Sequence, residues 1–152
     1  MSADRLARAR RALERVRDPE LPALSIAEIG ILREVRLEGE TLVVAVTPTY
    51  SGCPAMGLIV AEIRRVLRDA GIGEARIDTR LAPAWSTDWI DAAARAKLAA
   101  AGIAPPERDR PVSCPRCGAG AVETLSEFGA TACKALMRCT ACREPFERFK
   151  CH

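Results

Sequence analysis

The sequence contains a single histidine, His152. Catalytic arrangements that pair a nucleophile with a histidine base, such as Cys–His or Ser–His–Asp, are therefore nearly excluded. The glycine-rich phosphate-binding patterns GxxxxGK[ST] and GxGxxG are also missing. We therefore expect a protein that is not itself catalytic.

Long apolar runs are missing as well. No uncharged apolar stretch approaches the roughly 20 residues that span a bilayer, and the arginine-rich start has no apolar segment typical of a signal peptide. Apolar residues still make up 49% of the 152 residues, which is enough to bury a core. We expect a cytoplasmic protein without a membrane partner.

Lysine and aromatic residues are scarce, with 3 lysines against 20 arginines and 4% aromatics. Residues 1–17 carry six arginines against Asp4 and Glu14. This charge of +4 indicates either a docking face for an acidic partner or nucleic acid, or a solvated helix face. Residues 107–152 carry only +2, without interleaved basic and aromatic side chains, which argues against nucleic acid as a partner.

Cysteine, in contrast, is abundant, and six of the seven cysteines lie in the last 39 residues. In a reducing cytoplasm such a cluster is typical of a metal site or reactive thiols. Cys114 and Cys117, followed by Gly118, form one CxxC pair, and Cys139 and Cys142 form another. Two intervening residues let one turn direct both thiolates at a single ion, and four thiolates are the usual shell of structural zinc. We predict a structural Zn²⁺ bound by these four cysteines.

The spacing of the tail also predicts its strands. The 21 residues between Cys117 and Cys139 suffice for a β-hairpin that brings the two pairs together, and the alternation over 145–149 predicts a closing strand. A module of this size buries too little apolar area to fold alone, so we expect the metal to supply its folding energy.

Three potential ligands are surplus to a four-thiolate site: Cys133, Cys151 and His152. The two thiols are candidates for binding iron or an iron–sulfur cluster, or for reactivity, with His152 as a candidate ligand. Alternatively, Cys133 is a small buried apolar residue and Cys151 has no role. The CxxC pairs would also suit a thiol redox protein, but neither follows a strand of a βαβ unit.

Cys53 lies apart from this cluster, in the segment Thr47-Pro48-Thr49-Tyr50-Ser51-Gly52-Cys53-Pro54. Pro54 predicts the start of a helix, and the unpaired N–H groups and dipole of that helix would favour the Cys53 thiolate. Hydroxyl side chains surround it in the sequence. The segment indicates a reactive or metal-accepting thiol, and a passive cysteine at the helix start is the alternative.

Hydrophobic periodicity predicts an α/β (α+β) fold. We expect helices over 4–16, 54–70 and 86–101, and strands over 29–37, 41–47 and 75–81, the first two antiparallel. Segment 20–27 is expected to be irregular or a single turn. The proline-rich, charged segment 105–112 predicts a linker between a domain at 1–104 and a cysteine-rich, zinc-ribbon-like domain at 113–152.

Several stretches resemble known families. Asp18-Pro19-Glu20, Ile29-Gly30-Ile31, the Cys53 segment and Pro83-Ala84-Trp85-Ser86-Thr87-Asp88-Trp89-Ile90 resemble the DUF59 (MIP18-like) domain, over about residues 5–103. Glu28 stands where relatives usually have Asp. The tail, with 131–136 and 149–152, resembles the extension of the phenylacetate-degradation PaaD (PaaJ) family. The resemblance implies a small mixed sheet with packed helices, followed by a zinc ribbon.

The resemblance also implies an accessory role beside the multicomponent di-iron monooxygenase that epoxidises the ring of phenylacetyl-CoA. In relatives the cysteine matching Cys53 serves iron–sulfur cluster assembly, so this protein would help mature the di-iron site or the iron–sulfur reductase. The implied partners are the oxygenase or reductase subunits, and a second copy of this chain is a further candidate. The alternative is a zinc ribbon that binds nucleic acid or protein without transferring metal.

Overall fold

The computed structural model describes residues 2–50 and 52–151. The chain forms two compact units, residues 1–90 and 91–152. The domain boundaries expected at 104/105 and 112/113 stay predictions, and the division between the compact units falls earlier. No helix among the described residues combines the length and apolarity that crossing a membrane requires.

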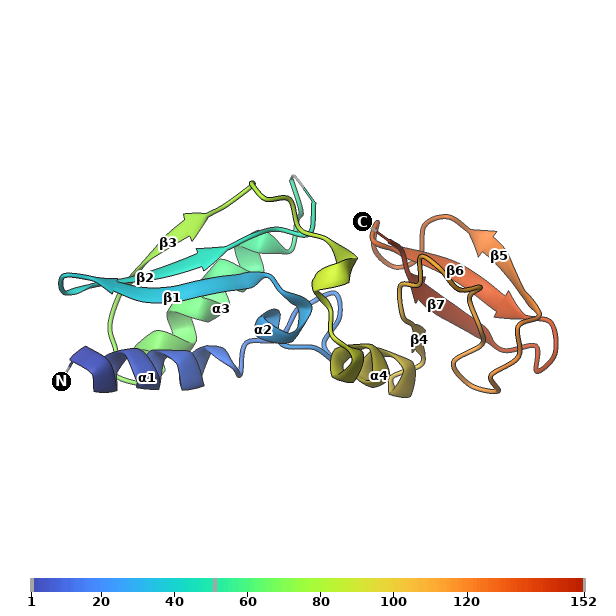
Figure 1. Ribbon diagram of the computed structural model, residues 1–152, viewed down its shortest axis with the longest axis horizontal. Coiled ribbons are helices and arrows are strands. Elements are labelled where there is room, and N and C mark those ends of the chain that lie inside the picture. The colour runs from blue at the N-terminus through green and yellow to red at the C-terminus, as the bar shows by residue number, and fades with distance from the viewer. Residues whose placement is uncertain (1, 51, 152) are drawn as a thin grey trace. The chain divides into compact units, whose positions relative to one another are not determined.

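The first unit contains a three-stranded sheet in the order β1-β2-β3. Strands β1 and β2 are antiparallel around the turn at Gly39, and β2 and β3 are parallel, joined through α3. The predicted hairpin and the predicted strand and helix that follow it are therefore confirmed. The elements are α1 (Ser2–Leu13), α2 (Ile26–Ile29), β1 (Leu32–Glu38), β2 (Thr41–Val46), α3 (Met56–Asp69), β3 (Ala75–Thr79) and the 3₁₀ turn η1 (Thr87–Trp89), drawn in Figure 1.

Helices α1 and α3 pack against each other and against the sheet, because each presents an apolar stripe at helical spacing. The fully buried side chains of these helices include Leu13 of α1 and Ile63 and Leu67 of α3. The central strand β2 is buried from Leu42 to Val46, as expected for a strand covered on both faces. The first unit thus has a core of its own.

Six charged side chains cover the outer face of this sheet; they alternate in sign along β1 and β3 and are Glu34, Arg36, Glu38, Arg76, Asp78 and Arg80. Arg36 reaches across β2 to Asp78, with 3.4 Å between nitrogen and oxygen. Hydrogen bonds from Arg76 hold the pKa of Asp78 below its ordinary value, although burial opposes this. The charges of the two signs balance, so this face carries little net charge.

Several helix boundaries differ from those expected, including that of α1, which spans Ser2–Leu13 rather than 4–16. Helix α3 begins at Met56 rather than Pro54, because residues 54 and 55 form a turn in which the Cys53 carbonyl accepts the Met56 N–H at 3.2 Å. The helix expected over 86–101 is two pieces, since Asp91 accepts the Ala94 N–H and starts a new helix. Of the two alternatives expected for segment 20–27, the structure has the single turn, helix α2, which begins at Ile26.

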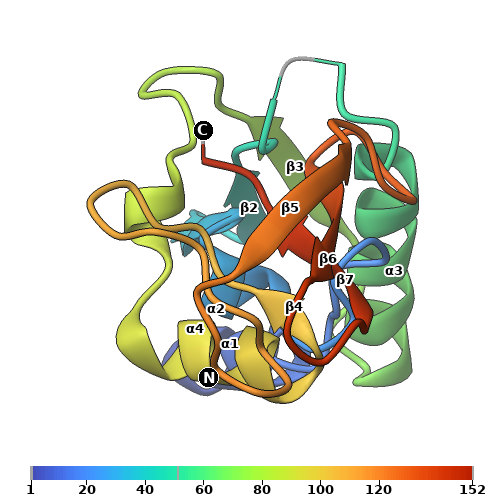
Figure 2. The same cartoon turned by 90° about the vertical axis from the view of Figure 1, so that its right-hand side faces the viewer.

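The second unit is a small ribbon of four strands in the order β4-β7-β6-β5. Figure 2 shows β5, β6 and β7 side by side. Neighbours are antiparallel except β4 and β7, which are parallel, so the predicted hairpin and closing strand are confirmed. The elements are α4 (Ala92–Ala100), β4 (Ile103–Ala104), β5 (Val122–Ser126), β6 (Lys134–Cys139) and β7 (Pro145–Phe149).

The hydrophobic core of the ribbon is small and includes two of the predicted ligands. Its buried members are Ala104, Cys114, Met137, Cys139 and Phe146. Met137 and Phe146 are the large apolar side chains of this cluster, and Phe149 of β7 is also fully buried. A core of this size stabilises little by itself, which leaves a role for a bound metal in holding the fold.

Candidate metal centre

The structure brings the four predicted ligands of the ribbon together. The sulfur atoms of Cys114, Cys117, Cys139 and Cys142, hereafter the four-sulfur site, all lie within 4.8 Å of one another. The Sγ–Sγ distances are 3.8 Å for Cys114–Cys142 and 3.6 Å for Cys117–Cys139. A tetrahedron with metal–sulfur bonds of about 2.3 Å has edges of about 3.8 Å. The arrangement therefore fits one tetrahedrally coordinated ion.

The two CxxC turns repeat the same backbone hydrogen bonds. The N–H of Cys114 donates to the carbonyl five residues on, Ala119, at 2.8 Å, and the N–H of Cys139 donates to Glu144 at 3.0 Å. In each turn the first cysteine is buried and also accepts a backbone N–H at 3.4 Å, from Arg116 or Cys142. Such N–H donors stabilise a thiolate. Each turn thus presents one buried and one exposed sulfur to a common centre.

The sulfurs influence one another's ionisation. The Cys142 N–H is the main cause that lowers the pKa of Cys139 to about 7, against the opposing effect of burial. The pKa of Cys142 is raised to about 12, because burial and the neighbouring sulfurs outweigh the Glu144 N–H, which favours its thiolate. Four thiolates this close repel one another, and a cation at their centre removes that repulsion.

The residue after the second cysteine adopts a left-handed backbone in both turns. Gly118 has φ 78° and Arg143 has φ 64°, and Arg143 is the only non-glycine among the described residues with a positive φ. A glycine adopts this conformation without penalty, whereas a side chain costs about 1–2 kcal/mol there. The first turn is therefore relaxed at this position and the second is strained.

We expect Arg143→Gly to stabilise the ribbon by about 1 kcal/mol, because it removes this strain. Gly118→Ala is expected to cost about the same, since a Cβ at Gly118 would meet no atom within 4 Å and only the backbone is affected. Urea unfolding of the metal-loaded chain, followed by ribbon NMR signals, measures both. Arg110→Gly, in an exposed segment without a positive φ, is the control. Loss of stability in Arg143→Gly would contradict the prediction.

The surplus thiols of the ribbon lie away from the four-sulfur site. Cys133 precedes β6 and Cys139 ends it, and six strand residues span about 20 Å. Cys133 is buried, with its Sγ 3.0 Å from the Thr131 hydroxyl. The Lys150 N–H donates to the Cys133 carbonyl at 2.9 Å, which places the half-buried Cys151 one residue step from Cys133 across the two strands. The candidate ligand His152 lies outside the described residues.

Cys53 is the only cysteine of the first unit. Its loop follows β2, and the carboxyl ends of β2 and β3 lie at the same edge of the sheet because these strands are parallel. The thiol is 9% exposed and accepts a hydrogen bond from the Thr49 hydroxyl at 3.8 Å. It precedes helix α3 by three residues, further than Pro54 suggests. A single thiol cannot fill a thiolate coordination shell, so a metal at Cys53 needs other ligands as well.

Two of the stretches that resemble DUF59 pack against each other. The Trp85 Nε1–H donates to the Ile29 carbonyl at 2.9 Å, and a Cβ on Gly30 would lie 3.2 Å from the Cβ of Trp89. The Arg33 guanidinium lies 3.8 Å over the Trp89 ring. These residues are therefore structural, a role that the sequence pattern alone does not reveal.

Comparisons with known proteins agree with this architecture. The chain matches the family model of an iron–sulfur cluster assembly protein over residues 6–78 and that of the PaaD zinc beta ribbon domain over residues 100–150. It superimposes on the crystal structure of a DUF59 domain from Bacillus anthracis with a TM-score of 0.57 and 26% identity, covering 64% of this chain and 93% of that one. The predicted fold class is confirmed.

Two curated relatives extend the comparison. Over 79 residues the chain is 34% identical to the Fe-S protein maturation auxiliary factor YitW of Bacillus subtilis strain 168, covering 51% of this chain and 74% of the relative. Over 146 residues it is 44% identical to a protein of Escherichia coli K12 that is named as a subunit of 1,2-phenylacetyl-CoA epoxidase, covering 91% and 88%. The chain therefore belongs to the PaaD family of phenylacetyl-CoA epoxidase subunits, with a DUF59-type unit followed by a PaaD zinc beta ribbon.

Proposed function

We propose that this protein is an accessory factor of a phenylacetyl-CoA ring epoxidase and assists the assembly of an iron or iron–sulfur centre in that enzyme. The 44% identity to a relative named as a subunit of such an epoxidase supports the first part. The match to an iron–sulfur assembly family supports the second. The observation that carries the proposal is that Cys53 is the one cysteine of the first unit and does not belong to the four-sulfur site.

The four-sulfur site binds zinc in a structural role. Its four cysteines fill a tetrahedral shell and leave no position open to a substrate, which is the mark of a structural rather than a catalytic zinc site. Their thiolates also satisfy the preference of Zn²⁺ for sulfur ligands. The ion is a permanent part of the ribbon.

Cys53 binds the cargo. Thiolates are soft ligands that suit iron and iron–sulfur clusters, and one thiolate provides a weak and therefore exchangeable attachment. The remaining ligands come from the recipient, an oxygenase or reductase subunit of the epoxidase. The iron centre then leaves with the recipient.

The proposal is tested by Cys53→Ser in cells that express the epoxidase. We expect the iron occupancy and the activity of the purified epoxidase each to fall about tenfold, because removal of a metal-site residue commonly has an effect of this size. Cys133→Ser and Cys151→Ser show whether the surplus thiols contribute. The Cys53→Ser protein should keep its zinc and its unfolding midpoint, which excludes a folding defect. Unchanged iron content in the epoxidase would end the assembly role.

A further inference from the structure

Two arginines of α3 have no partner among the residues that the structure describes. The guanidinium groups of Arg64 and Arg68 make no hydrogen bond, ion pair or ring contact with any of them. Arg65, between them in the sequence, is held by Glu62 at 2.6 Å and Asp69 at 2.8 Å. The helix thus carries one paired arginine and two that can bind something else.

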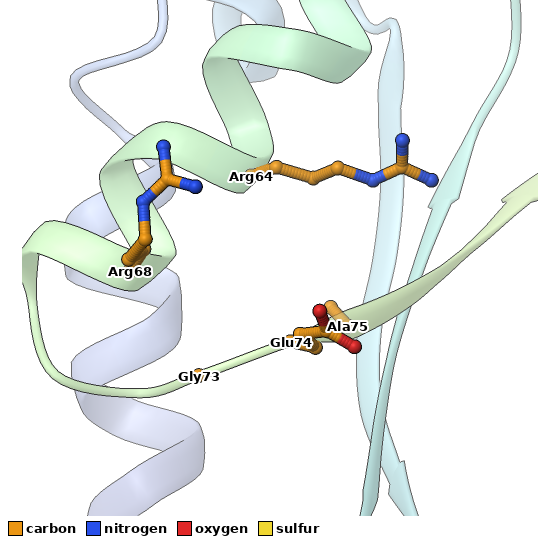
Figure 3. A pocket seen from close by; sticks show the side chains of 5 residues that line it. All are labelled: Arg64, Arg68, Gly73, Glu74 and Ala75. Carbon is orange, nitrogen blue, oxygen red and sulfur yellow. The ribbon is translucent and has the colours of Figure 1, made fainter.

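These two arginines line a cavity of about 350 Å³. The opposite wall is the segment Gly73-Glu74-Ala75, which leads into β3 (Figure 3). In Figure 3 the side chain of Arg64 reaches from α3 toward the strands above Ala75, the guanidinium of Arg68 points upward along the helix, and the Glu74 carboxylate projects from its segment. Within the described part of the chain no ion pair joins Glu74 to Arg64 or Arg68, so neither guanidinium is neutralised by it.

We propose that this cavity binds a small molecule that carries a phosphate or diphosphate group. The planar fork of arginine matches phosphate oxygens in a bidentate manner. Residues four apart on a helix have Cβ atoms about 5–6 Å apart, so the exposed side chains of Arg64 and Arg68, whose guanidinium groups point apart in Figure 3, can turn toward one phosphate or two adjacent phosphates. The cavity volume lies in the range of small-molecule sites, which leaves room beyond the anion itself.

Glu74 gives the site a second property. Its carboxylate repels a phosphate dianion, which limits affinity, and neutralising it strengthens the binding of any purely anionic ligand. When Glu74 is neutralised, a ligand that carries a positive charge would instead lose the carboxylate that pairs with that charge. The Glu74→Gln variant is therefore expected to bind purely anionic phosphates more tightly.

The test is a ¹H–¹⁵N NMR titration of the zinc-loaded full chain at low salt with inorganic phosphate, pyrophosphate and ADP in separate arms. We expect saturable shifts at the amides of residues 73–75. Arg64→Gln and Arg68→Gln are each expected to weaken binding by about tenfold. The matched control Arg65→Gln should change it by less than about twofold, because that charge is already paired. Glu74→Gln should tighten it.

Tighter binding of pyrophosphate and ADP than of phosphate assigns the site to a diphosphate, and equal affinity assigns it to a single phosphate. The proposal is overturned if residues 73–75 show no saturable shift. It is also overturned if Arg65→Gln weakens binding as much as the other two variants, because the attraction would then be nonspecific. Weaker binding of these anions by Glu74→Gln would also overturn the proposal, because the carboxylate would then support the bound anion rather than repel it. The measurement needs no epoxidase, so its outcome is independent of the proposed function.

Discussion

Removing the metal from the four-sulfur site is expected to unfold the ribbon while the first unit stays folded. The ribbon buries few large apolar side chains, chiefly Met137, Phe146 and Phe149, and two of its other buried residues are ligands. Structural zinc in small domains contributes about 10–16 kcal/mol of apparent binding energy near neutral pH. That far exceeds what such a core supplies. The first unit keeps its own buried helices and sheet and does not depend on the ion.

The chain offers separate probes for its two units. Both tryptophans, Trp85 and Trp89, belong to the first unit, so tryptophan fluorescence reports on that unit alone. Backbone NMR signals of Met137 and Phe146 report on the ribbon. With chelator, the ribbon signals should collapse to the narrow range of an unfolded chain, while the tryptophan emission stays unchanged.

A pair of cysteine variants supplies the matched control. Cys139→Ser removes a fully buried ligand and should abolish both zinc binding and the ribbon fold. Cys133→Ser changes an equally buried thiol near the other end of β6, outside the site, and should keep a stoichiometric ion. Well-dispersed ribbon signals in protein shown to be free of metal would refute the dependence of the fold on zinc.

The β5–β6 hairpin and strand β7 of the ribbon could be predicted from sequence because their signals are local, whereas β4, which pairs with β7, was not predicted. Two CxxC pairs separated by 21 residues leave a hairpin as the simplest way to join four sulfurs, and the structure has that hairpin in β5 and β6. The β1–β2 hairpin could be predicted equally well, because a strand pattern on each side of Glu38-Gly39-Glu40 specifies a tight turn. In both cases the residues that decide the structure are close in sequence.

Features that depend on capping and on long-range contacts were not predicted. The capping box of Ser25 and Glu28, each side chain accepting the other's N–H at 3.1 Å, was not predicted, and it makes the segment a single turn, helix α2, rather than irregular. Its Ser-x-x-Glu pattern is readable but covers only four residues. The last helix begins after Asp91 rather than after Ser86, because Asp91 is followed by an uninterrupted alanine-rich run. Nothing in the sequence around Arg143 indicates that its φ is positive.

The residues of the candidate sites also differ in whether local sequence or long-range pairing determines their positions. The four ligands of the ribbon follow from their spacing, whereas Cys133 and Cys151 come together only through the pairing of β6 with β7. Cys53 was identified from its loop, but the turn at residues 54–55 that separates it from α3 depends on the backbone around Tyr50 and Met56. Long-range pairing, rather than local propensity, therefore sets where each surplus thiol lies.

Gly30→Ala is expected to destabilise the first unit by about 3 kcal/mol, from backbone strain together with a steric clash. Gly30 has φ 90°, and a Cβ there would lie 3.2 Å from the Cβ of Trp89 and 3.4 Å from Nε1 of Trp85. Displacing Trp85 would also weaken its buried hydrogen bond to the Ile29 carbonyl. Urea unfolding followed by tryptophan fluorescence measures the loss, and the native emission should shift to the red as the indole meets water.

Gly39→Ala separates the two contributions. Gly39 has φ 60°, but a Cβ there would meet no atom within 4 Å, so this variant should lose only about 1 kcal/mol. Equal losses in the two variants would show that the tryptophans make room for the methyl group. The larger loss at Gly30 has a consequence for function, because the carbonyl of the next residue, Ile31, accepts the Thr47 N–H at 2.8 Å. Thr47 begins the loop of Cys53, so the packing of Gly30 against the tryptophans helps fix the strand end from which that loop departs.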